Sequence, residues 1–345
     1  MAKKSNILLI YTGGTIGMVK DYKTGALRAF NFNELINNLP ELNQLECEIR
    51  GVSFKKPIDS SSMNPKHWAT IATIVENNYA DFDGFVVLHG SDTMSYSASA
   101  LSFMLENLDK PVIFTGSQLP IGDLRTDAKE NLITSIQIAA LTENGIPIIR
   151  EVGLYFEYKL YRANRTTKIN AEHFEAFTSL NYPPLIESGV HLNVFYPNLY
   201  TGTDSKTPLM ANKKMDTNVA ILKLFPGLCR NVLESVLKIS GLKALVLETY
   251  GAGNAPTEDW FLTALENALA NGLHIINVTQ CSGGSVAMGQ YESSRRLKAM
   301  SMINGKDITT EAAITKAMYL LGNRVPSKDF KRLFETSLRG EMRQN

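Results

Sequence analysis

Two threonines and two glycines stand together near the start of the chain, directly after a short apolar run. The run Ile7–Ile10 leads into Y-T-G-G-T-I-G at residues 11–17, so Thr12 and Thr15 flank the glycine pair. Glycines at the end of a strand can present bare backbone N–H groups to a phosphate, or they can clear space for a hydroxyl nucleophile. The residue types alone leave this choice open, and they do not tell which threonine would act.

The phosphate interpretation is weakened by the spacing of the glycines. A dinucleotide-binding loop needs G-x-G-x-x-G, whereas residues 13–17 read G-G-T-I-G, and the Walker pattern G-x-x-x-x-G-K-[ST] occurs nowhere in the chain. No H-E-x-x-H pattern or C-x-x-C pair suggests a metal site, and the three cysteines are widely separated. We therefore expect neither a nucleotide cofactor nor a metal.

A hydroxyl nucleophile needs a base to take its proton, and lysine is the best candidate. The serine-hydrolase elbow G-x-S-x-G is absent, the five histidines are scattered, and His89 at the end of an expected strand is typical of a packed side chain. Lys168, in the stretch R-T-T-K at 165–168, has hydroxyls beside it. A lysine that is partly desolvated loses its proton more readily, although a lysine taken alone is more typical of an exposed surface.

The elements that would position these groups alternate between strand and helix patterns. Helical periodicity predicts helices at Thr93–Leu108, Asp127–Leu141 and Glu258–Ala270, the last with Thr257 as its N-cap. Short apolar runs predict strands at Ile7–Tyr11, Gly84–His89, Pro111–Thr115, Ile148–Phe156, Val219–Leu224, Ala244–Thr249 and Leu273–Thr279. This alternation predicts an α/β fold with a mainly parallel sheet and helices on both of its faces.

Ligands of an open parallel sheet bind at the carboxyl ends of its strands, and hydroxyls follow several of the expected strands. The loops concerned are Gly90–Thr93, Gly116–Gln118, Tyr250–Asn254 and Gln280–Gly284. Ser91 and Asp92 are equally suited to cap the helix that follows them. Taken alone, Asp59, Ser60 and Ser61 favour a local turn without any substrate. Several such loops together favour a site more than any one of them does.

The length and composition of the chain indicate two domains. A chain of 345 residues exceeds what one core usually serves. A stretch at 195–216, rich in Pro, Gly, Thr, Asn and Lys, reads as a linker between an N-terminal domain at 1–194 and a C-terminal domain at 217–345. A formal net charge of +1 argues against a nucleic-acid partner. No apolar run suits a membrane span and the start does not resemble a signal peptide, so we expect a cytoplasmic protein.

Eight short segments, in order along the chain, resemble the signature motifs of bacterial-type L-asparaginases. They are T-G-G-T-I-G (12–17), I-D-S-S-S-M (58–63), H-G-S-D-T-M (89–94), T-G-S-Q-L-P (115–120), N-R-T-T-K (164–168), Y-G-A-G-N-A-P (250–256), T-Q-C (279–281) and L-R-G-E (338–341). The chain is most similar to the type I, cytoplasmic branch. The resemblance implies a two-domain asparaginase-like fold with a smaller C-terminal α/β domain. It also implies hydrolysis of L-asparagine to L-aspartate and ammonia without a cofactor or a metal.

The resemblance further implies a role for each matching residue. Thr15 would attack the side-chain amide and form an acyl-enzyme, while Ser91, Asp92 and Lys168 would form a second catalytic cluster. In that cluster Lys168 would take the proton of the hydroxyl that activates substrate or water. Asp92 would accept a charge-assisted hydrogen bond from the α-ammonium group of the substrate.

The resemblance places the substrate among additional polar residues. Asp59, Ser60 and Ser61 would hold its α-amino and α-carboxylate groups. Backbone N–H groups near Ser117 and in the loop of the second cluster would form an oxyanion hole. Asn254 would reach the site of a neighbouring subunit. The resemblance therefore implies a homo-oligomer, usually a tetramer built as a dimer of dimers.

Three positions depart from the family pattern. Ser91 stands where the family usually has threonine, so its hydroxyl lacks the β-methyl group that restricts χ1. The family's tyrosine on the loop after the nucleophile has no counterpart at 25–27, and Tyr22 is the nearest phenol that could activate Thr15. Glu248 stands where the allosteric type I enzyme has arginine. A carboxylate there should repel the carboxylate of an L-asparagine effector, so we expect no such allostery.

Other interpretations stay open beside the L-asparaginase. Glutamine differs from asparagine by one methylene, which a pocket discriminates by only about 1–3 kcal/mol, so a minor glutaminase activity is not decided by the sequence. The glutaminase subunit of the archaeal tRNA-dependent amidotransferase shares the fold but carries an extra N-terminal domain, whereas the first expected strand here begins at Ile7. An inactive amino-acid-binding sensor is the alternative outside the enzymes.

Overall fold

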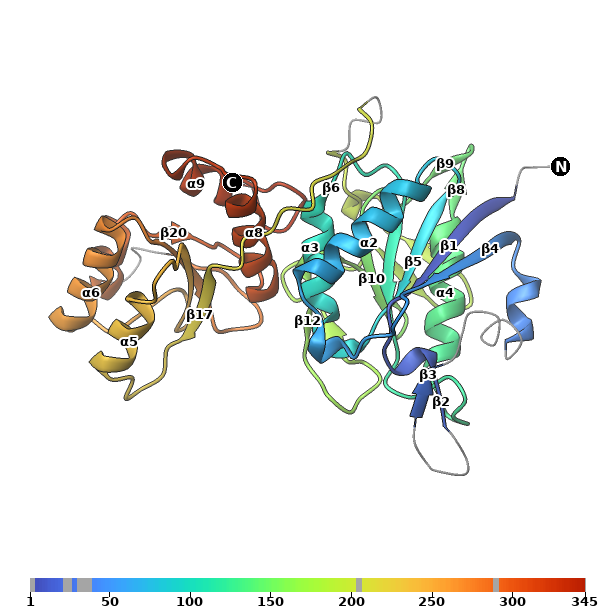
Figure 1. Cartoon of the computed structure of the whole chain (residues 1–345), viewed down its shortest axis with the longest axis horizontal. Coiled ribbons are helices and arrows are strands. Elements are labelled where there is room, and N and C mark those ends of the chain that lie inside the picture. Colours follow the sequence, from blue (N-terminus) through green and yellow to red (C-terminus); the bar gives the residue numbers. More distant parts are fainter. Residues whose placement is uncertain (1–3, 21–26, 30–38, 203–206, 288–291, 345) are drawn as a thin grey trace. The chain divides into compact units, whose positions relative to one another are not determined.

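The chain folds into two units, each built on its own β-sheet (Figure 1). The computed structural model describes residues 4–20, 27–29, 39–202, 207–287 and 292–344. The first unit spans Met1–Lys213 and the second spans Lys214–Asn345. The stretch 195–216 contains a 3-10 turn, η6 (Tyr196–Asn198), and a short strand, β16 (Met210–Ala211).

An eight-stranded sheet forms the first unit, and it is mainly parallel, as the sequence predicts. Its strand order is β15-β14-β11-β10-β7-β5-β1-β4. The strands are β1 (Ser5–Tyr11), β4 (Cys47–Ser53), β5 (Gly84–Leu88), β7 (Val112–Thr115), β10 (Val152–Phe156), β11 (Lys159–Arg162), β14 (Ile186–Ser188) and β15 (Leu192–Val194). Strands β4, β1, β5, β7 and β10 pair in parallel, and the other three extend the sheet in antiparallel. The carboxyl ends of β1, β5 and β7 therefore lie at one edge.

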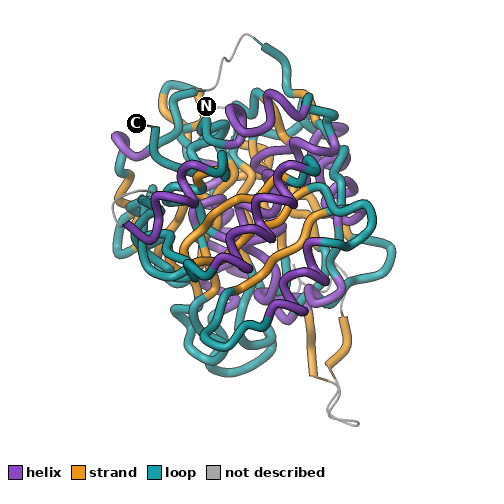
Figure 2. The backbone as a smooth tube through the Cα atoms, turned by 90° about the vertical axis from the view of Figure 1, so that its left-hand side faces the viewer, coloured by secondary structure: helices purple, strands orange, loops and turns teal. Residues whose placement is uncertain are grey.

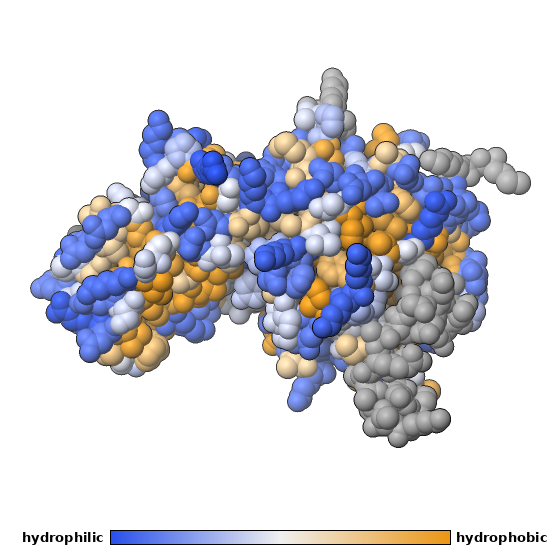
Figure 3. Space-filling view, in the orientation of Figure 1, coloured by the Kyte–Doolittle hydropathy of each residue, from blue (hydrophilic) through white to orange (hydrophobic). Residues whose placement is uncertain are grey.

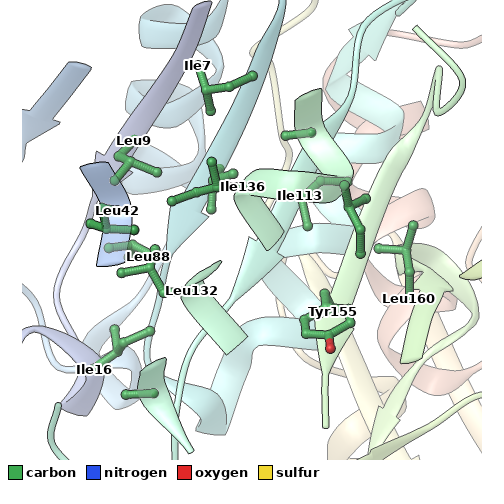
Figure 4. Close-up of a cluster of buried hydrophobic side chains, with 14 of the residues drawn as sticks. Ile7, Leu9, Ile16, Leu42, Leu88, Ile113, Leu132, Ile136, Tyr155 and Leu160 are labelled. Carbon is green, nitrogen blue, oxygen red and sulfur yellow. The ribbon is translucent and has the colours of Figure 1, made fainter. Parts of the chain in front are cut away.

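Helices cover both faces of this sheet, because successive strand residues point to opposite sides. Ile7 and Leu9 of β1 belong to a buried cluster with Leu132 and Ile136 of α4 (Ala128–Ala140) (Figure 4). The other face packs against α3 (Met94–Met104), and α2 (Pro65–Asn78) lies beside α3 (Figure 1). Burying one such aliphatic side chain contributes about 1.5–3 kcal/mol. The packing therefore holds the strand ends, and the loops that follow them, in fixed places.

Short ribbons and 3-10 turns complete the first unit. The ribbons are β2 (Met18–Lys20) with β3 (Leu27–Ala29), β6 (Leu105–Glu106) with β16, β8 (Thr142–Glu143) with β9 (Ile146–Pro147), and β12 (Thr167–Lys168) with β13 (Phe177–Thr178). The turns are η1 (Thr15–Gly17), η2 (Pro40–Gln44), η3 (Ser60–Ser62), η4 (Ser91–Thr93) and η5 (Ala163–Arg165). Figure 2 shows the β2–β3 ribbon, which directly follows η1, extending away from the rest of its unit.

The second unit carries a four-stranded parallel sheet in the order β17-β18-β19-β20. Its strands are β17 (Val219–Lys223), β18 (Ala244–Thr249), β19 (His274–Thr279) and β20 (Ile303–Asn304), and its helices are α5 (Arg230–Leu237), α6 (Asp259–Ala270), α7 (Glu292–Ala299), α8 (Thr310–Gly322) and α9 (Ser327–Phe334). Phe261 and Leu265 of α6 pack with Leu245 and Leu247 of β18 in the core. Both units are thus α/β, which confirms the predicted fold class.

A buried ion pair ties the last residues of the chain to α8. Lys316 and Glu341 are both fully buried, and they pair directly. The Lys316 amine also donates to the carbonyl oxygens of Phe334 and Thr336, at 2.7 and 2.6 Å. Glu341 in turn accepts the backbone N–H of Leu338 at 2.9 Å. The L-R-G-E segment therefore closes this end of the second unit through a charged hydrogen-bond network.

Some predicted boundaries are wrong, and long-range pairing explains one of these errors. The helix predicted to reach Leu108 ends at Met104, because the next two residues leave it to form β6 against β16. Thr257 is not the N-cap of α6, since Glu258 occupies that position. The strand predicted at Ile148–Phe156 is limited to β10. The sequence argument missed β4, β11, β14 and β15 of the large sheet, and it missed the helices α2, α5, α7, α8 and α9. Among the described helices, none combines the length and apolar character that a membrane span requires.

Candidate active site

The loops that follow β1, β5 and β7 meet at the carboxyl edge of the large sheet. The Gly13–Gly14 pair lies against the backbone of two other loops, one at Ile58 and one at Gly90. A Cβ atom on Gly13 would lie 2.1 Å from the Ile58 carbonyl oxygen, and one on Gly14 would lie 2.4 Å from the Gly90 nitrogen. Both glycines also have positive φ, of 134° and 88°. Of the two roles predicted for these glycines, binding a phosphate or clearing space for a hydroxyl nucleophile, the structure supports the second.

The two threonines beside the glycines differ in what their hydroxyls do. Thr12 is fully buried, and its Oγ1 donates to the carbonyl oxygen of Leu88 at 2.9 Å. Thr15 is only half-buried at the start of η1, and no described residue forms a hydrogen bond with its hydroxyl. The Thr12 hydroxyl thus helps to hold β1 against β5, whereas the Thr15 hydroxyl has no hydrogen-bond partner among the described residues. This distinction could not be made from residue types.

Lys168 lies between a hydroxyl and a carboxylate. Its Nζ donates to Ser91 Oγ at 2.9 Å and to Asp92 Oδ1 at 2.7 Å. The lysine side chain is 18 % exposed, whereas the Asp92 side chain is 66 % exposed. The alternative of a free surface lysine is therefore wrong. The N-cap alternative for Ser91 and Asp92 is also wrong, because Thr93 occupies the N-cap of α3 and no side chain caps that helix.

Gln118 completes the surroundings of Ser91, and the sequence argument gave it no role. The Ser91 hydroxyl donates to Gln118 Oε1 at 3.3 Å, while the Gln118 amide donates to the carbonyl oxygen of His173 at 3.0 Å. Gln118 thus connects the loop after β5 with the loop after β12. Gln118 follows Ser117 in the segment T-G-S-Q-L-P, and this position could have identified it as a candidate site residue.

Asp59, Ser60 and Ser61 form a turn that contacts the same edge. Asp59 Oδ1 accepts both the backbone N–H and the hydroxyl of Ser61, each at 2.9 Å. These two hydrogen bonds lower the pKa of Asp59 below its ordinary value. The turn is joined to η4 because Thr93 Oγ1 donates to the Ser60 carbonyl oxygen at 2.7 Å. The local-turn interpretation is confirmed, and the turn nevertheless lies against the Ser91 loop.

The side chains of Ser117 and His89 already form hydrogen bonds within the protein. The Ser117 hydroxyl donates to the carbonyl oxygen of Leu119 at 2.6 Å, and the residue is buried. His89 is fully buried with Nδ1 2.7 Å from the Gly90 carbonyl oxygen, and burial lowers the pKa of its imidazole to about 4. The prediction that His89 is a packed, hydrogen-bonded side chain is confirmed.

The structure does not place two of the predicted site residues relative to this edge. Tyr22 lies outside the described residues. Asn254 belongs to the second unit, in the loop after β18, where its backbone N–H bonds the Tyr250 carbonyl oxygen at 2.8 Å. In the same unit the carboxylate of Glu248 accepts the hydroxyl of Thr310 at 2.7 Å.

Known proteins resemble this chain in sequence and in fold over nearly its whole length. The family model described as "Asparaginase, N-terminal" matches residues 6–200, and "Glutaminase/Asparaginase C-terminal domain" matches residues 218–334. L-asparaginase 1 of Escherichia coli (strain K12) is 39% identical over 341 residues, which cover 99% of this chain and 98% of that protein. The crystal structure of L-asparaginase I from Vibrio cholerae O1 is 37% identical with a TM-score of 0.90, and the match covers 99% of this chain and 100% of that one.

A more distant relative represents the rival interpretation. One component of the glutamyl-tRNA(Gln) amidotransferase of Methanobrevibacter smithii is 31% identical over 344 residues, which cover 99% of this chain but 78% of that protein. The fold and the hydroxyl–lysine–carboxylate cluster define a two-domain α/β amidohydrolase. The chain belongs to the asparaginase family, and it is similar to type I members along its whole length.

Proposed function

We propose that this protein is an L-asparaginase, which converts L-asparagine and water to L-aspartate and ammonia. The observation that supports this most strongly is the placement of Lys168, whose amine contacts the Ser91 hydroxyl and the Asp92 carboxylate at the edge where Thr15 is available. A hydroxyl nucleophile, a lysine beside a second hydroxyl and an exposed carboxylate are the groups that amide hydrolysis through an acyl-enzyme needs. No cofactor or metal takes part in the proposed reaction.

Thr15 is the proposed nucleophile. Its Oγ1 attacks the side-chain amide carbon, the C–N bond breaks, and ammonia leaves with the proton that the hydroxyl gives up. The product of this step is an ester between Thr15 and the substrate's side-chain carboxyl group. Water then hydrolyses the ester, which releases L-aspartate and restores the hydroxyl. Tyr22 is the proposed phenol that relays the first proton.

The second cluster would bind the substrate and help the proton transfers. Asp92, with 66 % of its side chain exposed, would accept a hydrogen bond from the α-ammonium group. Lys168 donates to Ser91 Oγ, and Ser91 donates to Gln118, so the serine hydroxyl has a fixed direction before substrate arrives. When Ser91 activates substrate or water, Lys168 would act as the neutral amine, having given one proton to solvent, and the Ser91 O–H would turn from Gln118 to Nζ, which takes its proton. Proton transfer by a positioned group typically contributes about 10²- to 10⁴-fold to the rate.

Backbone groups and the Asp59 turn would hold the rest of the substrate. Asp59, Ser60 and Ser61 would bind its α-amino and α-carboxylate groups, because their turn is joined to the Ser91 loop. The Ser117 N–H, together with backbone N–H groups near η4, would stabilise negative charge on the amide oxygen in the transition state. Losing one such donor typically costs about 2.7–4 kcal/mol of transition-state stabilisation.

The protein is further proposed to be a cytoplasmic homotetramer, built as a dimer of dimers, in which Asn254 serves the site of a neighbouring subunit. Large apolar side chains exposed on the second unit support self-association, since soluble monomers rarely expose such groups together. They are Ile221, Phe225, Val232 and Ile239, each between 38 % and 53 % exposed. Figure 3 shows apolar surface over the part of this unit that carries β17 and α5. Light scattering on the purified chain measures the assembly directly.

Steady-state ammonia release tests the proposed activity. The purified chain should release ammonia from L-Asn, and Thr15→Ala should abolish turnover while leaving L-Asn binding detectable by calorimetry. Thr12→Ser retains the buried hydroxyl and is the matched control, so it should keep turnover within about three-fold of the parent chain. Turnover unaffected by Thr15→Ala would refute the mechanism.

The same experiment separates the remaining alternatives. Tight L-Asn binding by the parent chain without any ammonia release would favour the amino-acid sensor. Release from L-Gln at a kcat/KM equal to that for L-Asn would favour a glutaminase. A requirement for a tRNA-dependent partner before any turnover would favour the amidotransferase component.

A further inference from the structure

The first turn of α4 contacts the loop that follows β7. Asp127 occupies the N-cap position, where a carboxylate ordinarily bonds the first N–H groups of its own helix. Here Thr126 Oγ1 accepts the Ala128 N–H at 3.0 Å instead. The Asp127 carboxylate reaches the loop: Oδ2 accepts the Gln118 N–H at 2.8 Å and Oδ1 accepts the Leu119 N–H at 3.1 Å. The side chain therefore binds a distant loop rather than its own helix.

Asn131, one turn later on α4, binds the same loop from the other side of Ser117. Its Nδ2 donates to the Gly116 carbonyl oxygen at 3.0 Å and to Asp127 Oδ2 at 3.3 Å. Its Oδ1 accepts the Glu157 N–H at 3.0 Å. The Asn131 side chain is fully buried and Asp127 is only 5 % exposed. With both ends of its amide group bonded, the asparagine cannot rotate without breaking these contacts.

These contacts determine where the Ser117 N–H points. The Gly116 carbonyl and the Ser117 N–H belong to one planar trans peptide, so the two groups point in opposite directions. Asn131 holds the carbonyl, and it thereby sets the direction of the N–H. Asp127 holds the next two N–H groups along the chain, so the peptides on both sides of Ser117 are anchored to α4.

The energetics indicate that this carboxylate has a purpose besides stability. No ion pair joins Asp127 to a lysine or arginine in the described part of the chain, and burial raises the pKa of its carboxyl above the ordinary value. A buried carboxylate without a cation loses solvation that hydrogen bonds only partly replace. A neutral side chain of similar shape would avoid that cost. It would, however, hold only one of the two loop N–H groups.

We propose that Asp127 and Asn131 are positioning residues for the reaction, which aim the Ser117 N–H at the oxygen of the scissile amide. Neither side chain touches the substrate; both act through the Gly116–Leu119 backbone. The inference rests on the proposed function, in which that N–H stabilises the developing negative charge. Misaiming such a donor should slow the chemical step more than it weakens substrate binding, because the charge develops only in the transition state.

The test compares Asp127→Asn with a matched carboxylate elsewhere in the first unit. In Asp127→Asn an NH₂ group replaces one carboxylate oxygen. This donor cannot accept the loop N–H that the oxygen accepted, so the loop shifts. Asp83→Asn is the control, because Asp83 Oδ2 also accepts a backbone N–H, that of Asn6 at 2.8 Å, just before β5 and thus at the opposite edge of the sheet. Asn131→Ser is the second variant, because serine is too short to reach the Gly116 carbonyl oxygen.

For Asp127→Asn and Asn131→Ser we expect kcat for L-Asn to fall roughly 10- to 100-fold with KM changed less than about three-fold. The double variant should lose little more than the worse single one, because both residues act on one loop. Asp83→Asn should keep kcat within about two-fold. A kcat near that of the parent chain in either site variant would overturn the inference, as would a loss that tracks the unfolded fraction measured by circular dichroism. A parent chain without turnover would instead overturn the proposed function.

Discussion

Replacing Lys168 by methionine separates its proposed chemical role from any structural one. The change removes the ammonium group but keeps a long apolar side chain in the partly buried position. The ion pair that is lost is partly exposed to solvent, because the Asp92 side chain is 66 % exposed while that of Lys168 is 18 % exposed. Ion pairs with an exposed partner contribute about 0–1 kcal/mol to the free energy of unfolding. For a unit of this size that predicts a shift in Tm of at most about 2–4 °C.

The effect of Lys168→Met on turnover should be far larger. Without the amine the Ser91 hydroxyl loses its donor, and the group proposed to take its proton is gone. A loss of about 10²- to 10⁴-fold in kcat is expected, which corresponds to about 2.7–5.5 kcal/mol of transition-state stabilisation. A coupled ammonia assay measures kcat, and calorimetry on the same sample measures Tm.

Lys213→Met is the matched control for this prediction. Lys213 lies 2.6 Å from Glu76 Oε2 with its side chain 32 % exposed, so it is also a partly buried lysine paired with a carboxylate in the first unit. It should show a similar small change in Tm and an unchanged kcat. A kcat of Lys168→Met within ten-fold of the parent value would refute the reasoning. An equal loss in both variants would show that the assay reports general destabilisation.

Two other predictions concern the second unit. Lys316→Met should lower the free energy of unfolding of its unit by about 3–5 kcal/mol in urea titrations, since it leaves the buried Glu341 without its cation. Lys238→Met, which removes an exposed pair with Glu234, should cost less than about 1 kcal/mol, and similar costs in both would contradict this account. The rate should depend hyperbolically on L-Asn concentration, because the Glu248 carboxylate, bonded to Thr310, would repel an effector's carboxylate. A clearly sigmoidal curve in steady-state kinetics would show that L-Asn is an effector after all.

The location of the site could be predicted from the sequence, because it depends on a local regularity. Alternating strands and helices imply parallel strands, and the ends of parallel strands lie at one edge. The hydroxyls after β1, β5 and β7 could therefore be placed together without any knowledge of their contacts. The strand Ala244–Thr249 was predicted at both ends for a similar reason, since its apolar run is bounded by turn residues.

The partners of individual side chains could not be predicted, because they depend on contacts between distant segments. Thr12 and Thr15 look alike in sequence, and the difference arises from the carbonyl oxygen of Leu88, which takes the Thr12 hydroxyl. The end of α3 is likewise set by β16, about a hundred residues later, since Glu106 pairs with Met210. Asp127 begins a predicted helix in the sequence, and only the structure shows that its carboxylate is bonded to the loop after β7.

Ser91 illustrates how such contacts change the meaning of a sequence departure. Threonine would restrict the hydroxyl through its β-methyl group, and serine lacks that restriction. In the structure the Ser91 hydroxyl is oriented by its partners instead, since it accepts a hydrogen bond from Lys168 and donates one to Gln118. Gln118 is itself anchored through its N–H to Asp127. A hydroxyl held by both a donor and an acceptor needs no methyl group to fix its direction. The serine at position 91 is therefore compatible with catalysis, and it no longer favours an inactive amino-acid sensor.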